Sequence, residues 1–422
     1  MIENKKSNVI NLGCRLNIYE GEVIKSLIKK YNINDYTIIN SCAVTNEAEK
    51  KVRYAIRKAK KLHPSKKIVV TGCAAQINPA KYAQMPEVNL VLGNNEKMKE
   101  QIWKNIQYAN QIQVGNIFKI SSTQNHIIKK FEGKARGYIE IQQGCDHRCT
   151  FCIIPFGRGN NRSVPVGVIV NRVKNLVKNN YKEVVLTGVD ITDYGKDLPG
   201  TPNLFQLSRR LLNLVPELKQ LRLSSIDCAE INEDLWPLLD NKRFMPYLHL
   251  SLQAGNDLIL KRMKRRHTKQ QTIEFCEKVR NYRNDVVFGA DIIAGFPTET
   301  NEMFEDSINL VKKCNLTHLH VFPFSARKST PAALMPQVPK DIIKKRARIL
   351  RNLGNINLRK YLNNQIGSKV KVLIEQVKDE ISIGKSQHFT KIEIPQILNE
   401  GSIVDCIVTD VYENISKATL IS

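Results

Sequence analysis

Three cysteines, Cys145, Cys149 and Cys152, lie on one short loop with the spacing C-x3-C-x2-C, directly after the alternating strand-like run 138–142. Three thiolates on one loop can ligate three irons of a single iron-sulfur cube, which leaves the fourth iron open to a small molecule. Zinc is the alternative, because His147 lies within the segment and Cys with His is also zinc chemistry. Closed zinc sites usually draw on two separated C-x2-C pairs, and the sequence holds no second C-x2-C. We therefore expect this loop triplet to bind a reactive iron-sulfur cluster, in preference to zinc or to three uncoordinated core thiols.

Three further cysteines, Cys14, Cys42 and Cys73, each follow a strand-like run and a small residue. The three runs are residues 9–12, 36–40 and 68–71. In a parallel sheet the carboxyl ends of the strands share one edge, where open α/β folds bind ligands. We therefore expect this strand-end triplet to converge and to hold a second metal cluster. The alternative is three small buried residues at the ends of strands.

The first part of the chain, residues 1 to about 120, alternates strands and helices in the pattern of a parallel sheet with crossover helices. One of these helices is expected from residue 46 to residue 61. Residues 108–132 lack clear periodicity and contain the polar cluster 121–125, which is typical of a linker. The sequence therefore predicts an N-terminal open α/β domain that is followed by a connecting segment.

The central part of the chain, residues 133–340, repeats a strand followed by a helical or mixed segment. The six strand candidates are residues 138–142, 183–186, 220–223, 247–252, 286–293 and 318–322. Six such units are too few for an eight-fold barrel and favour an open, partial (βα)6 barrel, with its site at the carboxyl ends of the strands. The polar and glycine residues of the segment fall at those ends.

After a basic helix at residues 339–360, the pattern changes to short alternating strands. About four are expected, at residues 370–374, 380–383, 403–408 and 418–421. Small all-β barrels of this kind commonly present a nucleic-acid-binding face. A capping or dimerising domain is the alternative.

The formal net charge of +25 comes from 65 Lys and Arg against 40 Asp and Glu. Lysine and arginine clusters gain affinity by displacing counterions from phosphates, so the charge indicates a polyanionic partner. A general lysine bias could inflate the total, but the charges are clustered. Residues 340–360 contain eight basic residues and one acidic residue. Residues 261–269 contain six basic residues and no acidic residue, and residues 50–67 contain nine basic residues.

The composition, with 42% hydrophobic and 25% charged residues, is that of a globular protein. No apolar run approaches the roughly 18 residues of a membrane span, and the polar start, residues 1–7, lacks the apolar core of a secretory signal. We therefore expect a cytoplasmic protein without a membrane partner, in which ten cysteines are ligands or buried residues rather than disulfides. Cys228, Cys276, Cys314 and Cys406 are scattered among apolar residues and are expected in the core.

The sequence contains no phosphate-binding loop, no dinucleotide-binding fingerprint and no zinc-protease helix.

Several local motifs occur together in this chain. They are LGCRLN at residues 12–17, NSC at 40–42, TGCAAQ at 71–76, the cysteine loop through Ile153-Ile154-Pro155, and Arg158-Gly159 with Arg162-Ser163 after it. On these motifs, nearly the whole chain resembles the radical S-adenosylmethionine (SAM) methylthiotransferases. That resemblance implies three domains: a cluster domain at residues 1–120, a radical-SAM core at 131–360 and a TRAM RNA-binding domain at 361–422.

The resemblance also implies the cofactors. The loop triplet would hold a 4Fe-4S cluster whose open iron chelates SAM and cleaves it to a deoxyadenosyl radical, and these three cysteines would be the catalytic residues. The strand-end triplet would hold an auxiliary 4Fe-4S cluster that handles sulfur. One SAM would supply the methyl group and another the radical.

The SAM contacts are expected from the aromatic residue before the last cysteine and from the polar and glycine residues at the strand ends. They are Phe151, Gly188, Asp190, Ser224, Gln253 and Gly295.

Within the family, residues 12–20 and 42–46 look most like the branch that adds a methylthio group to the adenine ring of N6-threonylcarbamoyladenosine beside the tRNA anticodon. The chain departs from that branch at three positions: it has Ser41, Ala43 and Ala74 where the branch more often has Thr, Thr and Tyr. None of these differences removes a cysteine of the two triplets. The rival branches act on isopentenyladenosine in tRNA or on an aspartate of a ribosomal protein. From a different class, an RNA-binding iron-sulfur sensor without turnover would need the clusters and the charge but no SAM pocket.

The partners implied are the anticodon stem-loop of tRNA and an electron donor such as flavodoxin or ferredoxin. The enzyme is expected to act as a monomer.

Overall fold

The N-terminal part of the chain is a five-stranded parallel sheet in the order β1-β2-β3-β4-β5. The computed structural model describes residues 8–421, so the polar start of the sequence lies outside the described residues. The strands are β1 (Asn8–Asn11), β2 (Tyr36–Ser41), β3 (Lys67–Gly72), β4 (Leu90–Leu92) and β5 (Ile112–Gln113). The helices are α1 (Arg15–Lys30), α2 (Asn46–Leu62), α3 (Cys73–Ile77), α4 (Pro79–Ala83) and α5 (Glu100–Lys104).

The expected strands and the helix at residues 46–61 are confirmed. Helix α2 begins after Thr45, whose side chain accepts a hydrogen bond from the backbone N–H of Ala48, and it buries Val52, Ile56 and Ala59 on one face. Strand β5 extends the sheet into the segment that lacks periodicity, because two residues are too few to leave a pattern.

Six parallel strands form the central partial barrel, as expected. They are β6 (Gly137–Glu140), β9 (Glu183–Thr187), β10 (Gln220–Leu223), β11 (Tyr247–Gln253), β12 (Val287–Ala294) and β13 (His318–Pro323). Two parallel bridges, Leu221 to Phe244 and Ile226 to Leu250, join the two halves of the barrel. The run expected at 138–142 ends at Glu140, and β7 (Gln142–Gln143) pairs instead with β8 (Arg162–Ser163), which follows the cysteine loop.

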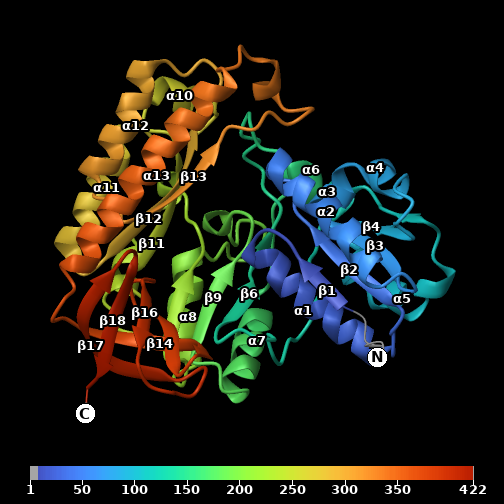
Figure 1. The fold of residues 1–422 in the computed structure, drawn as a ribbon, viewed down its shortest axis with the longest axis horizontal. Helices are drawn as coiled ribbons and strands as arrows, with labels where there is room; N and C mark the ends of the chain where they lie inside the picture. The colour runs from blue at the N-terminus through green and yellow to red at the C-terminus, as the bar shows by residue number, and fades with distance from the viewer. Residues whose placement is uncertain (1–7, 422) are drawn as a thin grey trace.

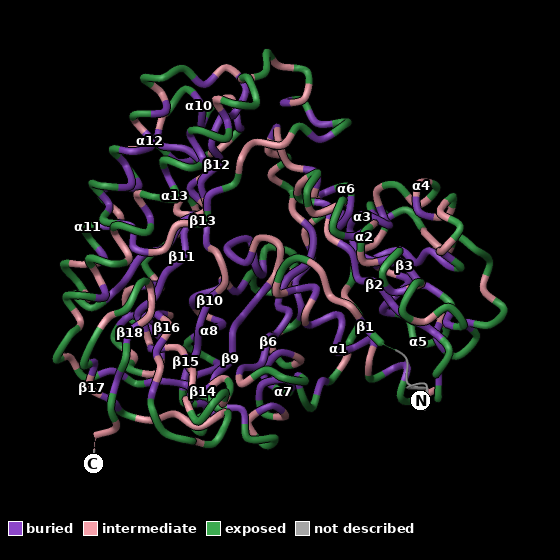
Figure 2. The backbone as a smooth tube through the Cα atoms, viewed as in Figure 1, coloured by how far each residue is buried: buried purple, intermediate pink, exposed green. Residues whose placement is uncertain are grey.

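Helix α6 (Ile154–Arg158) follows the cysteine loop and packs against α3 of the N-terminal part (Figure 1). The other helices of the central part are α7 (Val166–Lys178), α8 (Leu204–Leu214), α9 (Leu235–Leu239), α10 (Asp257–Arg262), α11 (Lys269–Tyr282), α12 (Asn301–Lys313) and α13 (Lys340–Asn363). Buried residues line the strands, while exposed residues lie on the outer faces of the helices (Figure 2). None of the helices within residues 8–421 is both long enough and apolar enough to cross a membrane.

The C-terminal part is a closed barrel in the order β14-β15-β16-β18-β17. Its strands are β14 (Lys369–Lys378), β15 (Ile381–Ser386), β16 (Lys391–Ile394), β17 (Ile403–Tyr412) and β18 (Ile415–Leu420). The barrel has one strand more than the four expected from sequence, because β16 is only four residues long. A small core of its own, which includes Val372, Ile392 and Val408, closes this barrel.

The N-terminal sheet and the central barrel share one hydrophobic core. Leu16, Tyr19 and Val23 on helix α1 belong to the same buried cluster as Tyr138 and Ile139 on strand β6. Helix α1 therefore packs between the two sheets, and it fixes the edge that carries Cys14 relative to the cysteine loop of the barrel.

Candidate active site

The loop triplet sits on a tightly held loop at the mouth of the central barrel. Gly144, directly before Cys145, has a φ of +70°, and a Cβ there would lie 1.8 Å from the carbonyl oxygen of Asn160, so only glycine fits. The backbone N–H of Cys145 donates to the carbonyl of Gly159 at 3.1 Å. The hydroxyl of Thr150 donates to the carbonyl of Arg262 at 2.8 Å. The loop is therefore pinned at both ends, with Cys145, Cys149 and Cys152 all partly accessible.

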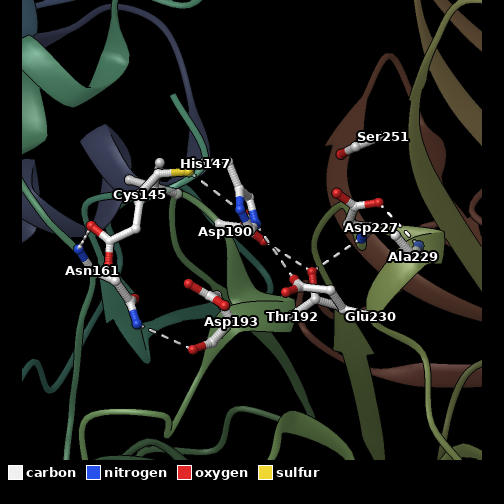
Figure 3. Close-up of polar contacts among 12 residues, drawn as sticks. Cys145, His147, Asn161, Asp190, Thr192, Asp193, Asp227, Ala229, Glu230 and Ser251 are labelled. Atoms are coloured by element: carbon white, nitrogen blue, oxygen red, sulfur yellow. Dashed lines mark hydrogen bonds and ion pairs between the residues drawn. The ribbon is translucent and has the colours of Figure 1, made fainter. Parts of the chain in front are cut away.

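The carboxylate of Asp190 lies beside the first cysteine of this loop (Figure 3). The Sγ of Cys145 lies 3.6 Å from Oδ2 of Asp190, and Nε2 of His147 lies 2.8 Å from the same oxygen. Hydrogen bonds to Asp190 and Glu230 raise the pKa of His147 to about 10. The side chain of His147 is therefore held against Asp190 and Glu230, beside Cys145.

A buried arginine reaches the second cysteine. Arg265 donates to Oδ2 of Asp227 at 2.8 Å and to the carbonyl of Ser251 at 2.7 Å, and its Nη1 lies 3.8 Å from Sγ of Cys149. Arg265 belongs to the basic segment 261–269, which the sequence favours as part of a surface for a polyanion. Its side chain is instead turned inward, so this part of the cluster compensates the charge of thiolates and carboxylates inside the protein.

The strand-end triplet converges at the carboxyl edge of the N-terminal sheet. A Cβ on Gly13 would lie 2.7 Å from Cβ of Cys42, which shows how closely the ends of β1 and β2 approach. Burial raises the pKa of Cys42 to about 11, and the neighbouring Cys73 and Cys14 add to this rise. Three cysteines from three strands therefore lie close enough to repel one another as thiolates, which fits a shared cationic group.

A buried network joins this edge to the central barrel. Arg158, on α6, donates through Nε to Sγ of Cys73 at 3.1 Å and through Nη2 to Oδ1 of Asn17 at 2.7 Å. It also pairs with Glu20, which accepts a second bond from Lys97 at 2.6 Å. Burial by itself raises the pKa of Glu20, but Arg158 and Lys97 outweigh it and lower the pKa to about 2. The sequence motifs include Asn17, Glu20 and Arg158 without indicating their roles, and Lys97 was missed. The available signal was the three-residue spacing of Asn17 and Glu20 on one helix face.

A cavity of about 210 Å³ is lined by residues that are close in sequence to a cysteine of each triplet. Its walls come from both domains and include Val44, Thr45, Phe151, Gln253, Asp291 and Phe324. Val44 and Thr45 follow Cys42 in the chain, and Phe151 precedes Cys152. A molecule in this cavity therefore touches segments next to both sets of cysteines.

The six residues expected to contact SAM lie in different environments. Phe151 and Gln253 line the cavity, and Asp190 lies beside Cys145. Gly188 and Gly295 instead allow close packing, since a Cβ would lie 2.7 Å from the carbonyl oxygen of Gln142 and 2.6 Å from Ile343, respectively.

Ser224 continues the central sheet, because its N–H donates to the carbonyl of Leu186 at 2.9 Å. All six residues stay predictions as SAM contacts.

Asp291 is a cavity residue that the sequence prediction missed. It lies 3.0 Å from Nε2 of His249 and 3.2 Å from Nδ1 of His320, and Ser225 donates to it at 3.3 Å. The available signal was a charged residue inside an otherwise apolar strand. Of the four scattered cysteines, Cys276, Cys314 and Cys406 are buried as expected, and Cys228 is half-buried.

Two family models match this chain. The Radical SAM superfamily covers residues 139–311, and the Uncharacterized protein family UPF0004 covers residues 6–93. Among solved structures, the radical S-adenosylmethionine methyltransferase TsrM from Kitasatospora setae has a TM-score of 0.56 at 13% identity, over 78% of this chain and 77% of that one. The partial barrel with its three-cysteine loop is therefore that of a radical-SAM enzyme.

Curated relatives narrow the class. The chain is 49% identical to the threonylcarbamoyladenosine tRNA methylthiotransferase MtaB of Rickettsia prowazekii, over 100% of this chain and 99% of the relative. It is 34% identical to the enzyme of the same name from Aquifex aeolicus, over 86% and 91%. It is 29% identical to the tRNA-2-methylthio-N(6)-dimethylallyladenosine synthase of Rickettsia typhi, over 96% and 97%. The chain belongs to the radical-SAM methylthiotransferases, a family of enzymes that transfer sulfur-containing groups.

Membership of this family implies SAM and a 4Fe-4S cluster.

Proposed function

We propose that this protein replaces a ring C–H of N6-threonylcarbamoyladenosine, beside the tRNA anticodon, with a methylthio group. The observation that carries the proposal is the 49% identity, over the full length, to a relative that bears this activity in its name. The identity to the Rickettsia typhi enzyme named for dimethylallyladenosine is 29%. This difference favours the threonylcarbamoyladenosine branch over the isopentenyladenosine branch.

The two cysteine triplets fit two 4Fe-4S clusters in this proposal. Cys145, Cys149 and Cys152 would hold one, and Cys14, Cys42 and Cys73 would hold the other. When bound, the first would supply the electron for reductive cleavage of SAM and the second would carry the sulfur that is transferred. Two SAM molecules are required, because one donates its methyl group and the other removes the ring hydrogen.

The residues of this chain contribute charge balance and exclusion of water. Arg265 lies against Cys149 and Arg158 lies against Cys73, so each triplet has a buried guanidinium that stabilises thiolates. The cavity of about 210 Å³ is walled by the aromatic rings of Phe151, Phe322 and Phe324. An apolar wall keeps water away from a reactive intermediate while the substrate ring is held.

The partners follow from the substrate and the charge. With a net charge of +25, the protein favours the phosphates of an anticodon stem-loop over a ribosomal protein that is itself usually basic. A cytoplasmic monomer with flavodoxin or ferredoxin as electron donor fits this role. The division expected from the sequence, at residues 1–120, 131–360 and 361–422, assigns the clusters to the first two domains and RNA affinity to the third.

The test uses the reconstituted protein with SAM, a reductant and tRNA from cells with or without threonylcarbamoylation. After digestion, we expect a methylthio mass gain on threonylcarbamoyladenosine alone. A gain on isopentenyladenosine would place the protein in the sister branch. RNA binding without SAM cleavage would support the iron-sulfur sensor instead.

A further inference from the structure

A second cavity, of about 190 Å³, lies where the N-terminal helix α1, the central strands and the C-terminal barrel meet. Its lining includes Arg15, His318, His320, Lys385, Phe389 and Lys391. Arg15 follows Cys14 in the chain. His320 lies 3.2 Å from Asp291, which lines the cavity of about 210 Å³. The two cavities therefore lie on opposite sides of one His–Asp pair.

The second cavity carries positive charge that the protein does not neutralise. Within residues 8–421, the side chains of Arg15 and Lys385 make no ion pair and no hydrogen bond. Each instead lies over the ring of Phe389, at 5.5 and 5.2 Å from its centroid. Burial lowers the pKa of Lys385, and nearby cations such as Arg136 lower it further, although Glu375 opposes this. Two inward-facing cations without a carboxylate partner are costly to hold together unless an anion joins them.

The nearby carboxylates are already engaged. Glu183 pairs with Arg136 at 2.5 Å and with Arg222 at 2.9 Å, and Glu375 also pairs with Arg136. Asp291 accepts from histidines, and Glu393 pairs with Lys391 at 3.0 Å. The charge of Arg15 and Lys385 therefore remains available to a ligand.

The cavity is built on a rigid frame. Phe389 stacks on Tyr247 of strand β11 with ring centroids 5.5 Å apart and planes 10° apart. Arg222 donates to the carbonyls of Ser386 and Gln387, both at 2.8 Å, which fixes the loop of the C-terminal barrel against the core. Lys385 and Phe389 are thus held in place before any ligand arrives, which lowers the entropic cost of binding.

We propose that this cavity binds one oxyanion of the tRNA substrate, and that the oxyanion is the carboxylate of the threonyl group. This inference rests on the proposed function. A guanidinium and an ammonium that face one small volume suit a single carboxylate or phosphate. The position beside Cys14 and behind Asp291 favours the substituent on the modified base over a distant backbone phosphate. An isopentenyl group has no charge, so the cavity would set the choice between the two nucleosides.

The experiment compares two anticodon stem-loops that differ only in the threonylcarbamoyl group. Their dissociation constants are measured for the wild-type protein and for Arg15→Gln and Lys385→Gln, which remove one cation from each side of the cavity. Lys378→Gln is the matched control, since Lys378 is an exposed lysine of the same barrel outside the cavity. The iron content and the melting temperature of each variant are also measured. If Arg15→Gln loses its iron or unfolds, Lys385→Gln decides the test.

We expect the wild type to prefer the modified stem-loop and each cavity variant to lose about tenfold affinity for it, while affinity for the unmodified stem-loop stays nearly constant. Lys378→Gln should weaken both stem-loops alike. Equal weakening of both by the cavity variants would assign the cavity to a backbone phosphate and overturn the carboxylate. Unchanged affinities for both would overturn the anion site altogether.

The binding measurements test this inference, whereas methylthiolation of tRNA tests the proposed function. A wild-type protein that methylthiolates threonylcarbamoyladenosine without preferring the modified stem-loop contradicts this inference alone. A protein that shows the preference and yields no methylthio product contradicts the proposed function alone.

Discussion

The Nε atom of Arg158, which follows the cysteine loop of the barrel, lies 3.1 Å from Sγ of Cys73, which ends a strand of the N-terminal sheet. The two residues are 85 positions apart in the chain. The guanidinium is 2% exposed, and its other contacts are Asn17, Glu20 and Gln143. One arginine therefore ties the barrel to the edge that carries the strand-end triplet.

Replacing Arg158 with Met should destabilise the protein by about 3–5 kcal/mol, because Glu20 would remain buried with Lys97 as its one cationic partner. Urea unfolding measures the change. The double variant Arg158→Met with Glu20→Gln is the control, and it should recover part of the loss because the unpaired carboxylate is gone. If Arg158→Met unfolds at the wild-type urea concentration, the network has no role in stability.

The two cysteine triplets should be separable, because they lie on different domains. Replacing Cys145, Cys149 and Cys152 with Ala should leave about half of the iron and abolish SAM cleavage. Replacing Cys14, Cys42 and Cys73 should also remove about half of the iron but leave reductive SAM cleavage measurable. Iron analysis and detection of cleaved SAM check both results. Loss of cleavage in the second variant, with the first cluster intact, would count against separate roles.

Deleting residues 362–422 should weaken tRNA binding and also destabilise the core. The deletion removes the carbonyls of Ser386 and Gln387, to which the buried Arg222 donates, and it removes Glu375 beside Arg136. Thermal unfolding should therefore show a lower melting temperature than that of the intact chain.

Point variants separate RNA affinity from stability. Neutralising the exposed lysines of β14, Lys369, Lys371 and Lys378, should leave the melting temperature nearly unchanged. Each lysine that contacts a phosphate should lower the salt slope of tRNA binding by about one unit. An unchanged slope in the triple variant would place the RNA on another face of the protein.

The contact between the C-terminal barrel and the core should weaken below pH 6.5. Burial lowers the pKa of His318 to about 3 and that of His388 to about 4, and His318 lies 3.2 Å from the carbonyl of His388. The lowered pKa values mean that the unfolded chain binds these protons first. Stability is thus complete above the unfolded pKa of about 6.5 and falls as the pH drops toward the folded values, by about 1.4 kcal/mol per imidazole at pH 5.5.

Unfolding curves between pH 7.5 and 5.5 test this, with His318→Gln as the comparison. The variant should show a shallower dependence on pH because it has one titrating imidazole fewer. Parallel curves for the two proteins would rule out His318 as a source of the dependence.

The sequence by itself determined the elements that depend on neighbours in the chain. The spacing of Cys145, Cys149 and Cys152 predicts a loop that can wrap one cluster, and the alternation of strands and helices predicts that Cys14, Cys42 and Cys73 share an edge. Short strands such as β5 and β16 were missed, because two to four residues carry too little periodicity to exceed chance.

Only the tertiary structure decided which side chains meet across domains. Arg158 and Glu20 are 138 residues apart, and no local pattern says that they form one buried ion pair. Arg265 lies in a basic segment whose composition favours an exposed face, yet packing turns this one side chain toward Cys149. The cavity beside Arg15 likewise needs three domains to form. The periodicity of a sequence indicates which face of a helix or strand is buried. The partner of a buried charge depends instead on how distant elements pack, because electrostatic energy depends on distance in space and not on distance along the chain.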